Sequence, residues 1–334
     1  MSRASSAATM RLPLQDLALA PASLKAYTTQ LNKFLAHSRL SQQQLLSAPA
    51  HQLDRLVAEF IQHSYDAGAP FTYASHALHA VVYHRPDLKQ HMFISRQCLK
   101  GWERVKKSAS HPPLTWELTV VIACTLARSG YHAHAVAVLV GFDCYLRVGE
   151  LTRLRRCDIV MPNDSRMGRA HTEMAVCLPT TKTGPNQSVS LQNPRVAGVL
   201  CSWVRSRAMA PDSTDPIFPF KPPALRRSMQ RVCAALGLSD TPYVPHSLRH
   251  GGATSDFLRT KSIEFVQFRG RWKSMESARR YVQTARALLA AQQVPQRLNA
   301  LGEALGDSLE DVMRHIMATV PETQPRRVAW AKGL

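Results

Sequence analysis

The chain has 334 residues, a length that favours two domains, and 42 Lys and Arg against 23 Asp and Glu give it a formal net charge of +19. Hydrophobic residues make up 45% of the chain, which excludes a largely disordered protein, and no apolar run approaches the ~18 residues of a membrane span. No P-loop, H-E-x-x-H or G-x-S-x-G pattern occurs, so ATP-driven, zinc-protease and serine-hydrolase chemistry lose support. The charge predicts a polyanionic partner, with nucleic acid first and an anionic membrane surface second.

The first third of the chain has a helical pattern. We expect residues 1–20 to be a disordered tail. Within residues 21–107, Leu24, Tyr27 and Leu31 recur at helical spacing, and two further apolar stretches of helical length follow at 53–65 and 73–83. Because no strand alternation interrupts them, this region is predicted to be a small bundle of about four helices.

A polar segment with paired prolines, residues 108–114, is the predicted linker between two domains. Thr115 then has the character of a helix N-cap, and Gly130 of the residue just past that helix's end. A second apolar helix is predicted from His132 to about Leu146. The second domain therefore begins with helices.

The spacing of apolar residues changes from a helical to an alternating pattern at residue 174. Met174, Val176 and Leu178 alternate with other residues, turn-forming residues follow at 180–186, and alternation resumes at Val189 and Leu191. This pattern predicts a β-hairpin, after which the chain returns to helices. The fold class is therefore mainly α with a small β-hairpin or sheet (α+β).

The C-terminal part of the chain, residues 291–334, contains an amphipathic stretch. Apolar residues such as Leu298, Leu305 and Val312 recur at helical spacing, with a break expected near Gly306. Such a helix packs either on its own domain or in trans on a neighbouring subunit, and the sequence leaves both open.

Four local patterns in the second half carry charged or aromatic side chains. They are Arg147 with Glu150, Lys182 in the hairpin, the run from His246 through Arg249 to His250, and Trp272 with Tyr281 nine residues later. Taken singly, each has an ordinary structural explanation: an Arg-x-x-Glu pair, for example, is usually a solvated ion pair worth about 0.2–0.5 kcal/mol. Taken together, two Arg, a Lys, a His, a Trp and a Tyr supply what phosphoryl transfer without a metal needs.

The order and spacing of these groups resemble the tyrosine recombinases, also called the phage integrase family. Residues 146–151 match a box reading L-R-x-x-E-L, residues 246–254 match H-x-L-R-H-x-x-A-T, and Trp272 precedes Tyr281 by the family's nine residues. The chain departs from the pattern where Arg271 intervenes between Gly270 and Trp272, and at the unusual pair of glycines 251–252. Lys221 is a weaker rival to Lys182.

The resemblance implies a role for each group. Tyr281 would attack the scissile phosphate to give a 3′-phosphotyrosyl link, while Arg147 and Arg249 would hold the phosphate. Lys182 would act as general acid toward the leaving 5′ oxygen, and His246 would assist proton transfer at the tyrosine.

The resemblance also implies supporting residues and an architecture. Trp272 would brace the phosphate and the nucleophile, and Glu150 and His250 would orient the arginines and the neighbouring backbone. Residues 21–107 would form a helical DNA core-binding domain and residues 115–290 the catalytic domain.

The implied activity is site-specific recombination or integration of double-stranded DNA. It would use no metal, ATP or other cofactor, and four protomers would assemble on two duplexes without a membrane. Both parts of the chain are basic, with 13 Lys and Arg against 6 Asp and Glu in residues 1–107 and 29 against 17 in the remainder, as expected if both touch DNA. The enzyme would act wherever its DNA is, in the nucleus if eukaryotic and in the cytoplasm if bacterial or phage, and would not be secreted.

Two alternatives share parts of this pattern. A type IB topoisomerase uses the same chemistry to relax supercoils, and a non-catalytic relative would bind DNA without cutting it. The long amphipathic stretch after Tyr281 favours a recombinase over the first, and the complete set of six groups argues against the second. The compact organisation, without zinc motifs, is typical of simple recombinases and of those carried by mobile elements.

Overall fold

The computed structural model describes residues 18–106, 111–168, 170–181, 184–241 and 243–323. The chain divides into two compact units, residues 1–109 and residues 110–334. Most of the predicted tail, residues 108–110 of the predicted linker and the hairpin tip with Lys182 lie outside the described residues. Within those ranges, none of the helices has both the length and the apolar content that crossing a membrane requires.

The first unit is a helical bundle, as its sequence predicts. Its elements are α2 (Pro21–Ser38), α3 (Gln42–Ser47), α4 (Ala50–Asp66), α5 (Phe71–His84), the 3-10 turn η1 (Pro86–Gln90) and α6 (Phe93–Val105). Helix α2 packs on α5, and α6 packs on α4. Between them, Phe34, Leu53, Val57 and Val81 are fully buried and form the core of the unit.

A buried carboxylate joins two helices of this unit. Asp54 of α4 accepts hydrogen bonds from the backbone N–H groups of Ile94 and Ser95, both at 2.9 Å, and from the Ser95 hydroxyl at 2.6 Å. It thereby satisfies the free N–H groups at the start of α6, where no residue of α6 itself provides a side-chain cap. The acceptor comes from a distant part of the chain, so local sequence patterns give no sign of it.

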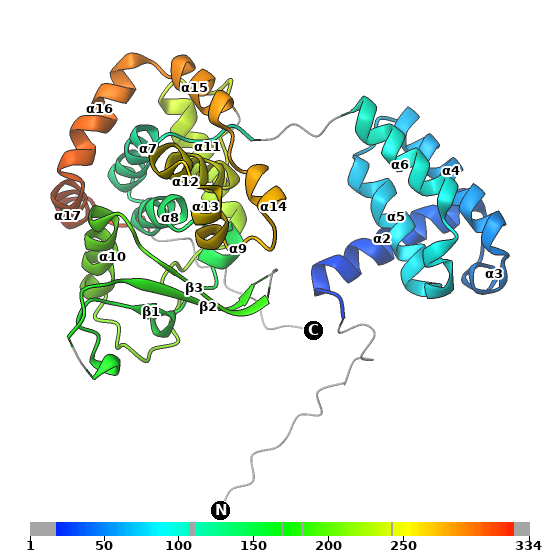
Figure 1. Ribbon diagram of the computed structural model, residues 1–334, viewed down its shortest axis with the longest axis horizontal. Helices are drawn as coiled ribbons and strands as arrows, with labels where there is room; N and C mark the ends of the chain where they lie inside the picture. Colours follow the sequence, from blue (N-terminus) through cyan, green and yellow to red (C-terminus); the bar gives the residue numbers. More distant parts are fainter. Residues whose placement is uncertain (1–17, 107–110, 169, 182–183, 242, 324–334) are drawn as a thin grey trace, which may run out of the picture. The chain divides into compact units, whose positions relative to one another are not determined.

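The second unit is built on two helices, α7 and α8, that pack on each other, and it carries further helices around them. Its helices are α7 (Trp116–Arg128), α8 (His132–Asp143), α9 (Val148–Leu151), α10 (Pro194–Ser206), α11 (Pro222–Ala235), α12 (Pro245–Thr260), α13 (Ile263–Gly270), α14 (Met275–Arg279), α15 (Thr284–Gln293), α16 (Gln296–Asp307) and α17 (Leu309–Thr319), with 3-10 turns η2 (Arg156–Asp158) and η3 (Ser165–Met167). Helix α8 is buried on all sides because α7, α10 and α12 pack against it (Figure 1). A helix that is apolar all round belongs in the centre of a domain.

Helix α8 ends earlier than its apolar pattern predicts. It stops at Asp143, not near Leu146, because Tyr145 adopts a left-handed backbone conformation with φ +50°. The chain then turns into the short helix α9. This turn brings the residues around Arg147 back beside α12 and α13.

The predicted hairpin is present and belongs to a three-stranded antiparallel sheet in the order β1 (Ile159–Val160), β2 (Ala175–Thr181) and β3 (Gly184–Ser190). Val176 pairs with Ile159 on one side and with Val189 on the other. All three side chains are buried in the core of the unit, which for Val176 and Val189 is what the alternation in the sequence predicts. The mainly helical fold class with a small sheet is thus confirmed.

The amphipathic C-terminal stretch packs on its own unit. It forms α16 and α17, separated at Ser308, and these lie against α7 and α10 (Figure 1). Leu309 and Met313 are fully buried there, and the backbone of α16 approaches α7 so closely that a Cβ on Gly302 would lie 2.4 Å from the carbonyl oxygen of Glu117. Of the two arrangements that the sequence left open, residues 296–319 therefore adopt the one in which they pack on their own unit.

The two consecutive glycines of α12 have a packing reason. A Cβ on Gly251 would lie 2.2 Å from the carbonyl oxygen of Leu114, and one on Gly252 would lie 2.1 Å from the carbonyl oxygen of Phe142. Both obstacles are backbone atoms, which cannot rotate away. Helix α12 therefore approaches the start of the unit and the end of α8 more closely than any residue with a side chain permits.

We predict that Gly251→Ala destabilises the chain by about 1–3 kcal/mol, because the added methyl group must displace backbone in a packed core. Calorimetric melting of the full-length variant measures this loss of stability. Gly101→Ala is the matched control, since nothing lies within 4 Å of the position in α6 and alanine favours the helix by up to about 1 kcal/mol. A Gly251→Ala protein that melts no lower than the parent would contradict the close approach.

Candidate active site

Arg147 lies at the start of α9, where its own backbone and side chain are tied to one carboxylate. Glu150 accepts a hydrogen bond from the Arg147 backbone N–H at 2.9 Å and one from Nη1 of the guanidinium at 2.7 Å. The Glu150 side chain is 2% exposed, whereas that of Arg147 is 25% exposed. Arg147 therefore keeps part of its guanidinium open to solvent while Glu150 anchors the rest.

Helix α12 contributes His246, Arg249 and His250 from its first two turns. Arg249 is completely buried, and its two terminal nitrogens donate to the carbonyl oxygens of Tyr145 and of Gly270, the latter at 2.9 Å. Those carbonyls belong to the turn after α8 and to the end of α13. The Arg249 side chain thus holds three segments of the unit together.

Trp272 and Tyr281 follow α13. The Trp272 ring lies directly on Gly270, where a Cβ would come within 1.7 Å of it, so the glycine provides the space for the indole. The Trp272 and Tyr281 ring centroids are 4.7 Å apart. Nδ1 of His250 lies 3.3 Å from the Tyr281 carbonyl oxygen, and the two rings stack at 4.7 Å. His250 therefore contacts the tyrosine's backbone and ring, and in the described ranges it makes no hydrogen bond to an arginine side chain.

These groups surround the Tyr281 ring. The Arg249 guanidinium carbon lies 4.4 Å from the centre of the Trp272 ring and 5.1 Å from that of Tyr281, and the His246 and Tyr281 rings are 5.5 Å apart. The structure thus brings together His246, Arg249, Trp272 and Tyr281, with Arg147 on the neighbouring α9. Lys182, the sixth predicted residue, lies outside the described residues, and the rival Lys221 is at the start of α11.

The cluster holds several positively charged side chains and few carboxylates to balance them. Burial, reinforced by the charges of Arg147 and Arg271, lowers the pKa of Arg249, which nevertheless stays protonated at neutral pH. Burial alone would raise the pKa of Glu150, but the hydrogen bond from the Arg147 backbone and the charge of Arg271 outweigh it and lower that pKa. Burial and the charge of Arg249 lower the pKa of His246, so its ring is neutral at pH 7.

Three buried N–H donors at the cluster have no hydrogen-bond acceptor among the described residues: Nε of Arg249, Nε of Arg271 and Nε1 of Trp272. Buried donors are almost always paired in folded proteins, and leaving one unpaired costs about 1–3 kcal/mol. Unpaired donors within an arginine cluster indicate a binding site for an anion that has several oxygen acceptors. No group of three His, Cys, Asp or Glu side chains in the described ranges could hold a metal ion.

A second arginine network lies behind the cluster, and motif reading missed it. Arg269 of α13 is buried between two carboxylates, pairing with Asp256 of α12 and with Asp143 at the end of α8, 3.2 Å away. Asp256 also accepts a hydrogen bond from the Tyr145 hydroxyl. Burial would lower the pKa of Arg269, but the two carboxylates raise it above its ordinary value. The network fixes α8, α12 and α13 relative to each other, and its members are too far apart in sequence to form a motif.

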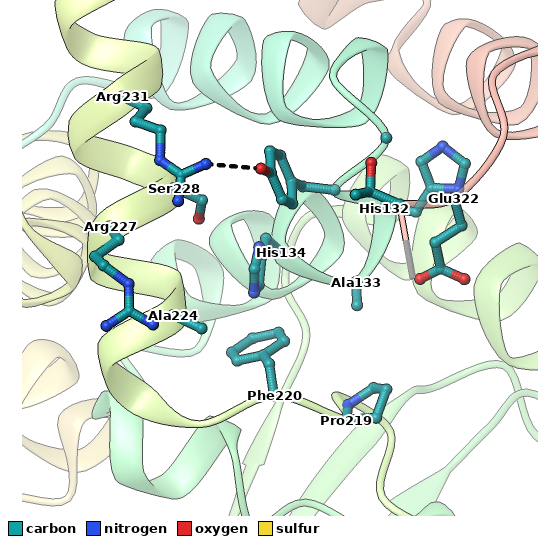
Figure 2. Close-up of a pocket in the computed structure, with 13 residues that line it drawn as sticks. His132, Ala133, His134, Pro219, Phe220, Ala224, Arg227, Ser228, Arg231 and Glu322 are labelled. Carbon is teal, nitrogen blue, oxygen red and sulfur yellow. Dashed lines mark hydrogen bonds between the residues drawn. The ribbon is translucent and has the colours of Figure 1, made fainter. Parts of the chain in front are cut away.

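Two of the pockets in the second unit differ in their relation to the candidate site. An open one of about 450 Å³ is lined by Gln187 of β3 together with Arg271 and Trp272, so the sheet borders the candidate site. Another of about 520 Å³ lies at the start of α8; Figure 2 shows Arg227 and Arg231 of α11 on one side of it and Glu322 on the other. None of the predicted site residues that the structure describes lines this second pocket, so it is separate from the candidate site.

Comparison with known proteins gives a consistent answer. The sequence profile of the phage integrase family matches residues 116–287. Among solved structures, a λ integrase dimer bound to a COC′ core site is 16% identical (TM-score 0.57; 81% of this chain and 93% of that chain covered). XerH site-specific recombinase bound to a palindromic difH substrate is 17% identical (TM-score 0.55; 84% and 78% covered), and the Tn1549 transposon integrase with circular intermediate DNA is 14% identical (TM-score 0.51; 80% and 98%). At such identities these structures show the shared fold. No curated protein sequence matches the chain significantly.

We predict that His250 makes the folded chain acid-sensitive. Burial and the neighbouring His246 lower the pKa of His250 to about 4, against 6.5 in an unfolded chain. Between pH 7 and pH 5 the unfolded state therefore gains a proton at His250 that the folded state does not, which destabilises the fold by up to about 2 kcal/mol. Urea unfolding of the parent and of His250→Gln at both pH values measures the difference; an equal loss in both proteins would contradict it.

Proposed function

Because the chain belongs to the phage integrase family, and is thus a DNA-cleaving and rejoining tyrosine recombinase, we propose that it works through a covalent link between Tyr281 and a 3′ phosphate of DNA. The observation that carries this proposal is the pair of unpartnered buried donors, Arg249 Nε and Trp272 Nε1, beside the Tyr281 ring. A phosphodiester whose non-bridging oxygens met these donors would bring its phosphorus within reach of the tyrosine hydroxyl.

The arginines are suited to holding that phosphate. A guanidinium has five N–H donors, of which Arg249 commits two to the carbonyls of Tyr145 and Gly270 and Arg147 commits one to Glu150. The remaining donors can bind the non-bridging oxygens and stabilise the negative charge that develops in the transition state. This places the charge compensation on side chains, and we propose that neither a metal ion nor ATP takes part.

The proton transfers follow from the pKa shifts and the positions. His246, neutral at pH 7 because burial and Arg249 lower its pKa, accepts the proton of the Tyr281 hydroxyl. The bond from the tyrosine oxygen to phosphorus forms as the bond from phosphorus to the 5′ oxygen breaks, and Lys182 gives that oxygen its proton. Rejoining reverses each step on a new strand, so the energy of the phosphodiester bond is conserved in the tyrosine link.

We further propose that double-stranded DNA is bound by both units, with residues 21–107 as the core-binding domain and 115–290 as the catalytic domain. The excess of Lys and Arg in both parts supports this, because phosphate neutralisation dominates affinity for DNA. A λ integrase tetramer bound to a Holliday junction has the same fold (15% identical; TM-score 0.56), which supports assembly of four protomers. The enzyme acts where its DNA is.

Tyr281→Phe is predicted to slow strand cleavage by at least about a thousandfold while leaving DNA binding largely unchanged, since only the attacking oxygen is removed. The measurement traps the covalent protein–DNA adduct on nicked duplexes taken from the DNA that flanks the gene, and a filter or gel assay follows binding. An adduct that persists in Tyr281→Phe overturns the assignment. Relaxed plasmid without any recombined product would favour a type IB topoisomerase activity.

Lys182→Ala is predicted to slow cleavage by about 10²–10⁴-fold, the usual contribution of a general acid. A substrate with sulfur in place of the 5′ bridging oxygen should restore the rate, because a thiolate leaves without needing a proton. Lys221→Ala is the matched control and should be indifferent to the sulfur. If the sulfur substrate rescues Lys221→Ala and not Lys182→Ala, the general acid is Lys221.

A further inference from the structure

Arg271 occupies a position where its backbone favours glycine. It is the residue after α13, has φ +58°, and closes the helix by donating its backbone N–H to the carbonyl of Phe268 at 3.1 Å. A residue with a side chain is strained in this left-handed region, whereas glycine is not. The Arg271 side chain is also 5% exposed, so its guanidinium is removed from water at a cost. Its contacts must offset both penalties.

The main contact is a carboxylate shared with another arginine. Nη2 of Arg271 donates to Oε2 of Glu150 at 3.1 Å, and the same oxygen accepts the backbone N–H of Arg147 at 2.9 Å. The other oxygen, Oε1, accepts Nη1 of Arg147 at 2.7 Å. Nη1 of Arg271 also reaches the carbonyl oxygen of Cys144 at 3.4 Å. Arg271 thus ties the turn before Trp272 to α9 and to the end of α8.

This sharing changes what Arg147 can do. An arginine that faces a free carboxylate usually binds both of its oxygens with two parallel N–H groups. In that arrangement neither of the two nitrogens would be free to point its N–H group at a phosphate. Here Oε2 already accepts two N–H groups, one from the Arg147 backbone and one from Arg271. The Arg147 side chain therefore gives Glu150 a single hydrogen bond, from Nη1, and its other terminal nitrogen does not bind the carboxylate. Arg271 also adds a third guanidinium to a cluster whose nearest carboxylate is Glu150 alone.

We propose that Arg271 is a positioning residue that acts through Glu150 to keep the fork of Arg147 open for the substrate phosphate. It does not need to touch the phosphate. Its effect on strand cleavage rests on the proposed function, but its effect on Arg147 is a property of the free protein and is measured without DNA.

The first test is labelling of Arg147 with phenylglyoxal, followed by mass spectrometry of the free, full-length protein. In Arg271→Gly the backbone strain is relieved and Oε2 of Glu150 loses one of its two donors. The side chain of Arg147 then closes onto both oxygens of Glu150, and its labelling slows by at least about threefold. Lys261→Gly is the matched control, since Lys261 also closes a helix with φ +56° and, in the described part of the chain, forms no ion pair with Glu150. Unchanged or faster labelling of Arg147 in Arg271→Gly overturns the proposal, whatever the protein does to DNA.

The second test is the rate of single-turnover cleavage at saturating DNA. Arg271→Gly should slow it about tenfold to a hundredfold, as a misplaced contact group does, with DNA affinity and melting temperature close to the parent's. Arg271→Lys, which can still pair with Glu150, should recover part of both the rate and the labelling. A fall in melting temperature that accounts for the lost rate, with no recovery by Arg271→Lys, assigns Arg271 a structural role only and overturns the proposal.

A double-variant comparison shows whether the effect passes through Glu150. If it does, Arg271→Gly combined with Glu150→Gln cleaves about as slowly as the slower single variant, whereas independent effects multiply. Multiplied effects overturn the proposal. A parent protein that forms no adduct while Arg147 labelling still slows in Arg271→Gly refutes the proposed function and leaves the positioning of Arg147 supported.

Discussion

The candidate site depends on a single buried side chain, the guanidinium of Arg249. It donates to the carbonyl oxygens of Tyr145 and Gly270, so α12, the turn after α8 and the end of α13 meet at one point. A charge without solvent is tolerated there only because each terminal nitrogen has a fixed acceptor. The rings of Trp272 and Tyr281 complete its surroundings. The same contacts that stabilise the buried charge therefore place the aromatic groups beside it.

The surrounding packing serves this arrangement. Glycines 251 and 252 let α12 approach the backbone of Leu114 and Phe142. This close approach positions Arg249, which lies on the same helix, relative to the carbonyl oxygens that accept its hydrogen bonds. Arg269 pairs with Asp143 and Asp256 behind the site, so the helices that carry the acceptors are held by ion pairs removed from water. Buried pairs of this kind contribute little net stability, but breaking one is costly, which makes the arrangement of the three helices specific.

Charge is distributed unevenly between the two networks. Arg269 has two carboxylates, whereas Arg147, Arg249 and Arg271 have Glu150 as their nearest one. The first network is therefore balanced and structural, and the second keeps an excess of positive charge and unpartnered donors. A protein that stores such an excess at one site favours an anion there, and the net charge of the whole chain attracts the same kind of partner from a distance.

Local sequence patterns were sufficient for the fold class and the hairpin, because helical and strand periodicity are local properties of the chain. The spacing of Arg147, His246, Arg249, Trp272 and Tyr281 is local too, and it named these residues as candidates that the structure then brings close together. They also assigned Lys182, which stays a prediction. Three-dimensional packing was needed to establish where α8 ends, on which unit the C-terminal helices pack, and that Arg271 joins Glu150. Those outcomes depend on contacts between residues more than a hundred positions apart, or on a backbone conformation that packing imposes, and neither leaves a pattern in a short stretch of sequence.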